Sequence, residues 1–98
     1  MSLPIVFRVE AQTEFDLAFD WYEQQQRGLG VEFLTRVTEV LERIQSFPEA
    51  CEIVFEDARR AIVPKFPYLI LYKVEPDRIV ILAVFHSKRD PQVWSDRV

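Results

Sequence analysis

The hydrophobic pattern of this chain changes period at Pro48, and this change limits the folds that the sequence can adopt. From about residue 13 to Pro48, apolar residues recur at the three- and four-residue spacing of amphipathic helices. After it, they form short extended runs that are typical of strands. Residues 5–10 alternate loosely between apolar and polar and predict a short strand ahead of the helices. The predicted order is therefore strand, helix, helix, strand, strand, strand, which is an α+β fold with a mainly antiparallel sheet.

The first half of the chain predicts a helical hairpin. Thr13 and Asp16 have the spacing of a capping box, so we expect the first helix to begin there and to run to about residue 26. Gly28 and Gly30, the only two glycines, follow at once. Glycine just past a helix end adopts a left-handed conformation at little cost and lets the chain reverse. A second helix over residues 33–47 would then pack antiparallel to the first.

The second half predicts three strands, at residues 61–63, 68–74 and 79–85, with a turn at residues 75–78. Simple alternation divides the last strand between two apolar faces. One face would carry Ile79, Ile81, Ala83 and Phe85, and the other Val80, Leu82 and Val84. The helical hairpin can cover only one of them. Either the end of the chain, with Trp94, folds over the second face, or a partner protein covers it.

Composition narrows the class of protein. Ninety-eight residues, 49% of them hydrophobic, suffice for a single domain over residues 1–98. No apolar run approaches the roughly 18–20 residues that span a bilayer, and no secretory leader is evident, so we expect a cytoplasmic protein. Cys51 is the only cysteine and has no metal-ligand partner at the usual spacing, so we expect no metal and no cofactor. The net charge of -4 is unusual for a protein that depends on phosphate contacts.

Two segments resemble the RelE/ParE superfamily of bacterial toxins, the toxic halves of type II toxin-antitoxin modules, often called plasmid stabilization proteins. They read RAIVPKFPYLILY from Arg60 and ILAVFHSKRDP from Ile81, with Trp94 beyond. The resemblance implies a compact α+β toxin that an antitoxin wraps and silences, and hence a hetero-oligomer with that antitoxin. RelE-like members cut mRNA on the ribosome, whereas ParE-like members inhibit DNA gyrase with no known need for a catalytic residue.

The choice between these branches turns on His86, the only histidine. RNA cleavage needs a base, an acid and cations near the phosphate. His86 could serve as base or acid, with Arg60, Lys65, Lys88 and Arg89 as the cations. In the alternative interpretation, His86 ends a strand and the cations are solvated. No titratable aromatic residue follows Trp94, and the net charge is acidic, so both observations favour the ParE-like branch.

We therefore expect a gyrase inhibitor with no catalytic residue, in which Lys88, Arg89 and Trp94 bind the target. The alternative is a ribosome-dependent mRNA endoribonuclease that uses His86, Arg60, Lys65 and Arg89. Asp90 and Pro91 suit the first positions of a short helical turn that would carry Trp94 back to the fold, as an anchor or as a docking residue. Core packing is the expected role of four other rings, with stacking on RNA bases as the alternative, namely Trp21, Tyr22, Tyr68 and Tyr72. We expect Cys51 to pack as a small hydrophobic residue in the loop after the second helix.

Overall fold

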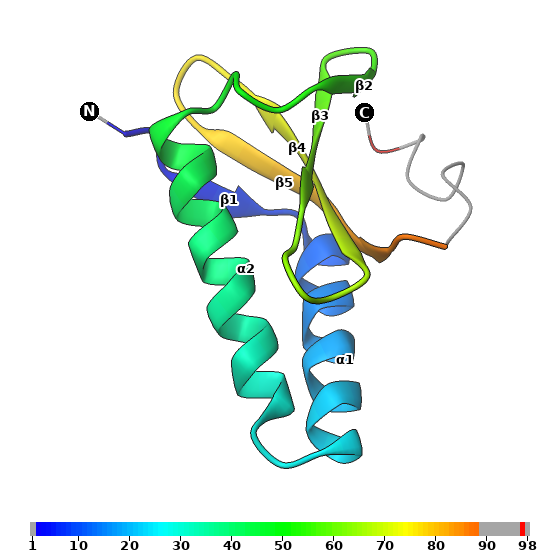
Figure 1. Ribbon diagram of the computed structural model, residues 1–98. Coiled ribbons are helices and arrows are strands. Elements are labelled where there is room, and N and C mark those ends of the chain that lie inside the picture. Colours follow the sequence, from blue (N-terminus) through cyan, green and yellow to red (C-terminus); the bar gives the residue numbers. More distant parts are fainter. Residues whose placement is uncertain (1, 89–96, 98) are drawn as a thin grey trace.

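A computed structural model describes residues 2–88 and 97 (Figure 1). The elements in chain order are β1 (Ile5–Phe7), α1 (Val9–Gln25), α2 (Leu29–Ser46), β2 (Ile53–Phe55), β3 (Ala58–Ile62), β4 (Tyr68–Val74) and β5 (Ile79–His86). They form one five-stranded sheet in the order β1-β5-β4-β3-β2. Only β1 and β5 are parallel. The α+β prediction is confirmed, although β2 was not foreseen as a strand.

The two helices lie side by side and are joined at the end away from the sheet (Figure 1). Helix α1 packs on α2 and, within the sheet, mainly on β5, whereas α2 touches the sheet at few points along β3. The helical spacing of Phe15, Ala18, Phe19 and Tyr22 predicts one apolar face on α1. That face does point to the core, where Ala18 and Tyr22 are buried and Phe15 stacks on Phe33 of α2. The predicted hairpin is therefore confirmed.

Helix α1 begins at Val9, four residues before the predicted Thr13. The capping-box prediction is wrong, because Arg8 is the N-cap, without a side-chain cap, and Asp16 accepts instead from the Gln12 amide. The pairing of β1 with β5 ends here, where the Arg8 N–H donates to the Ile81 carbonyl. The chain leaves the sheet at that point and coils directly, so a tertiary contact sets the start of the helix.

The two glycines act differently. Gly28 adopts φ +89° at the N-cap of α2, as predicted for a left-handed turn. Helix α2 begins at Leu29, four residues before the predicted residue 33, so Gly30 lies inside the helix and not in the link. Gly30 is needed for close approach: a Cβ there would lie 2.7 Å from the Phe19 carbonyl oxygen of α1. In the space between the helices, Glu23 accepts from the Gly30 N–H at 2.8 Å and from the Val31 N–H at 3.2 Å. The Glu23 carboxylate of α1 thus caps the first turn of α2. The free N–H groups and the positive dipole end of that turn stabilise its negative charge.

Both faces of the sheet are apolar, as predicted, but the division of β5 between them is not the predicted one. Leu71 pairs with Ala83 and Tyr72 with Ile81, so Leu82 is an extra residue in a β-bulge. The bulge reverses the alternation that follows it. Val84 therefore joins Ile79 and Ile81 in the helix-facing core. Ala83 and Phe85 instead join Val80, Leu82, Leu71 and Ala58 on the opposite face.

Candidate functional site

His86 ends β5 and lies across the ladder from Tyr68 of β4. The two rings meet edge to face with centroids 5.5 Å apart. The imidazole Nδ1 accepts a hydrogen bond from the Lys88 backbone N–H at 3.1 Å, so in its neutral form the ring carries its proton on Nε2. Neither nitrogen then offers a free lone pair to a 2′-hydroxyl. The geometry suits a residue that ends a strand and orders the following turn.

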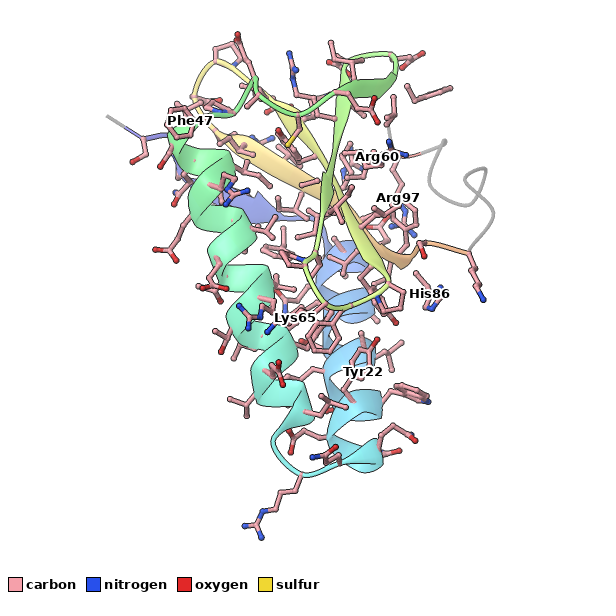
Figure 2. The ribbon with its side chains drawn as sticks, in the orientation of Figure 1. Tyr22, Phe47, Arg60, Lys65, His86 and Arg97 are labelled. Atoms are coloured by element: carbon pink, nitrogen blue, oxygen red, sulfur yellow. The ribbon has the colours of Figure 1, made fainter. Side chains whose placement is uncertain are left out.

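Of the cations predicted for a nuclease, Arg60 and Lys65 lie away from His86. Figure 2 shows Arg60, Lys65 and His86 at three separate places. Arg60 pairs with the Glu52 carboxylate across the β2–β3 hairpin, and Lys65 is exposed in the β3–β4 turn with φ +71°. Lys88 is exposed beside His86. The predictions for Arg89, for the Asp90-Pro91 turn and for Trp94 fall outside the described residues.

A hollow of about 320 Å³ opens next to His86, between α1 and β5. We call its rim the α1–β5 face; it comprises Glu14, Leu17, Trp21, Tyr68 and His86. Leu17 is 65% exposed and Trp21 is 56% exposed. The prediction that Trp21 packs in the core is therefore wrong, whereas Tyr22, its neighbour, is buried. Leu17 and Trp21 are four residues apart and off the core face of α1, and this spacing was the signal in the sequence for an exposed apolar stripe.

An ion pair lies at the edge of the same face. The Glu14 carboxylate of α1 receives two hydrogen bonds from the Arg97 guanidinium, at 2.9 and 3.1 Å. Glu14 also accepts from the Val84 N–H at 3.1 Å, and Arg97 donates to the Leu82 carbonyl at 3.1 Å. Strand β1 pairs with β5 only as far as Ile81. Beyond that residue, the Glu14 and Arg97 side chains take the place of a neighbouring strand for the Val84 N–H and the Leu82 carbonyl. No sequence signal links residues 14 and 97, because only the fold brings them together.

Two buried tyrosines have perturbed acidities. Burial raises the pKa of Tyr22, and the nearby Tyr68 raises it further. Burial is also the main reason that the pKa of Tyr72 lies above its ordinary value of 10.0. The Tyr72 hydroxyl donates to the Pro48 carbonyl at 2.8 Å, so this ring is a neutral link between β4 and the end of α2. Tyr72, like Cys51 at the core margin, thus has the predicted packing role.

Residues 2–88 and 97 contain neither a candidate metal site nor a candidate membrane-spanning helix. No group of three or more metal-binding side chains gathers in that part of the chain. None of the helices described is long and apolar enough to cross a membrane.

The comparisons with known proteins point in one direction. Residues 5–91 match the model of the ParE toxin of the type II toxin-antitoxin system parDE. Among solved structures, the chain is similar to a chromosomal ParDE toxin-antitoxin system from P. aeruginosa, with a TM-score of 0.76 and 13% sequence identity. The likeness covers 87% of this chain and 96% of that chain, and it shows a shared fold. No curated protein matches. With the family model covering almost all of it, the chain belongs to the ParE toxin family of type II toxin-antitoxin systems.

Proposed function

We propose that this protein inhibits DNA gyrase by binding it and that a cognate antitoxin neutralises it. The observation that carries the proposal is the match of residues 5–91 to the ParE toxin family. Inhibition of gyrase is the activity that this resemblance to ParE-like toxins implies. The similar structure from P. aeruginosa is that of a toxin-antitoxin system, which supports an antitoxin as the partner here. We place the action in the cytoplasm, where gyrase lies.

Docking explains the α1–β5 face better than catalysis does. The His86 Nδ1 is occupied by the Lys88 N–H, and the nuclease cations Arg60 and Lys65 lie elsewhere. The face does offer a half-exposed Trp21, which lines the same hollow as His86, and the exposed Lys88 follows His86 by two residues. Large aromatic side chains at the centre of an interface supply much of the binding free energy. We therefore add Trp21 to Lys88, Arg89 and Trp94 as target-binding residues.

The test is an in vitro supercoiling assay with purified gyrase. Trp21→Ala removes an exposed ring and should leave the fold intact, yet it should weaken inhibition by about 30-fold, the effect of losing about 2 kcal/mol at a hot spot. Val31→Ala, at another exposed apolar residue, is the matched control and should change little. Lys88→Glu should also weaken inhibition, because it reverses the charge at the proposed contact.

His86→Ala separates this proposal from the nuclease alternative. We expect the variant to retain most of its gyrase inhibition and its toxicity in bacteria. Normal supercoiling together with mRNA cuts at defined codon positions, abolished by His86→Ala, would instead establish a RelE-like nuclease.

A further inference from the structure

The hollow of the α1–β5 face is walled by aromatic rings. Trp21 of α1, Tyr68 of β4 and His86 of β5 line it together, and the Tyr68 and His86 rings meet edge to face. Leu17 adds an aliphatic side chain to the rim, most of it exposed. The volume of about 320 Å³ lies near the lower limit for small-molecule sites, which is about 300 Å³, so the hollow suits a single side chain.

Helix α1 supplies negative charge beside these rings. Its 17 residues include no base and five acids, namely Glu10, Glu14, Asp16, Asp20 and Glu23. Two of the acids already have partners, because Glu14 pairs with Arg97 and Glu23 caps α2. Asp20 is exposed, directly precedes Trp21, and has no ion-pair partner in the part of the chain that the structure describes. The outward side of α1 therefore places unmatched negative charge next to an exposed aromatic ring.

A guanidinium of the chain itself already lies at the edge of this hollow. Arg97 donates to both carboxylate oxygens of Glu14, a residue that lines the hollow, and to the Leu82 carbonyl. A guanidinium is planar, is only weakly hydrated and stacks on aromatic faces. Tryptophan is the ring that attracts a cation most strongly. The rings and the charge of this face therefore both favour an arginine side chain.

We propose that the hollow of the α1–β5 face binds an arginine side chain of the target, with the guanidinium stacked on Trp21 and its charge compensated by Asp20. This inference rests on the proposed function, in which the α1–β5 face docks on gyrase, and it states what the target surface must present there. A lysine suits the hollow less well, because its ammonium group is strongly hydrated and cannot stack. The exposed Lys88, two residues past His86, would face an acidic group of the target.

The first test needs no gyrase. 5-Fluorotryptophan incorporated at position 21 alone gives a ¹⁹F NMR signal that reports on the hollow. The probe is the peptide acetyl-Leu-Arg-Leu-amide, and the control peptide has citrulline, which has nearly the same shape but no charge, in place of arginine. The arginine peptide should shift the signal saturably, and the citrulline peptide should bind about tenfold more weakly or not at all. Asp20→Lys should weaken binding of the arginine peptide by a similar factor, since it replaces an attraction with a repulsion.

The second test uses inhibition of gyrase. Fluorine atoms withdraw electron density from the face of an aromatic ring and so weaken its attraction for a cation, while the size of the ring changes little. Mono-, di- and trifluorotryptophan at position 21 should therefore weaken inhibition stepwise. Trp21→Leu keeps an apolar side chain without the ring and should weaken inhibition by about 5- to 30-fold. Glu42→Lys, at an exposed position of α2 outside the face, is the charge control for Asp20→Lys and should leave inhibition unchanged.

Several results would overturn the inference: equal binding of the arginine and citrulline peptides, tighter binding of a lysine peptide, or inhibition that neither fluorination nor Asp20→Lys alters. Trp21 would then be an apolar contact only. The two proposals fail separately. A protein that binds the arginine peptide without inhibiting gyrase refutes only the proposed target. One that inhibits gyrase but distinguishes neither the peptides nor the fluorinated rings refutes only the arginine site.

Discussion

The ion pair between Glu14 and Arg97 should contribute measurably to the stability of this small domain, although it joins α1 to the penultimate residue of the chain. Glu14→Gln keeps the side-chain shape and an oxygen for the Val84 N–H, but removes the charge that holds the guanidinium. Both side chains are largely buried, with 14% and 15% of their surface exposed. Exposed ion pairs contribute less than about 1 kcal/mol, whereas breaking a buried one costs about 3–5 kcal/mol.

We expect Glu14→Gln to lower the free energy of unfolding by a value between these limits, about 2 kcal/mol. Two charge-assisted hydrogen bonds are lost, yet an unpaired Arg97 can turn into water, which relieves part of the desolvation cost. For a domain of this size, 2 kcal/mol lowers the melting temperature by roughly 8–16 °C. Urea unfolding monitored by circular dichroism gives the free energy directly. Glu39→Gln, which breaks an exposed pair with Arg36, is the control and should cost at most about 0.5 kcal/mol.

A double-mutant cycle isolates the pair from other effects of the substitutions. Glu14→Gln, Arg97→Gln and the double variant should give a coupling energy of about 1–3 kcal/mol, the range for residues in direct contact. Costs that add to within about 0.5 kcal/mol, as for independent sites, would show that the two side chains do not stabilise the fold through each other.

Two more predictions concern Tyr72 and the glycines. Because burial raises the pKa of Tyr72 above 10.0, the unfolded chain loses the phenolic proton at lower pH than the folded chain, so stability should fall as the pH rises past 10.0. Tyr72→Phe should lower the free energy of unfolding by about 1 kcal/mol at neutral pH. It should also flatten the decline of stability above pH 10.0, although Tyr22, whose pKa is raised too, would leave a residual slope. An unchanged slope, measured by chemical denaturation at several pH values, would contradict the assignment. Gly30→Ala should destabilise by about 1–3 kcal/mol through overpacking against α1, and Gly28→Ala by about 1 kcal/mol through its positive φ. Thermal melts that place Gly30→Ala at or above the wild type would refute the close approach of the helices.

The candidate site was only partly visible in the sequence. His86 and Lys88 were identified from residue type, and they do lie together at the end of β5. Residue type predicts a core position for Trp21, because aromatic residues are usually buried, whereas its position on α1 turns the ring outward. The hollow between α2 and β3 left no signature in the sequence, because its walls come from a helix and a strand that only the fold brings together.

Local periodicity was enough to determine the helical hairpin, the turn at Gly28 and the strands β4 and β5, because each depends on residues that are neighbours in the chain. The tertiary structure alone decided the start of α1 at Val9 and the bulge at Leu82, since both follow from pairing between distant segments. The bulge moved Val84 into the helix-facing core, a change that strict alternation could not anticipate. Only the folded chain could bring Glu14 to Arg97 and keep Arg60 and Lys65 away from His86, because contacts across so many residues depend on the packing of whole elements.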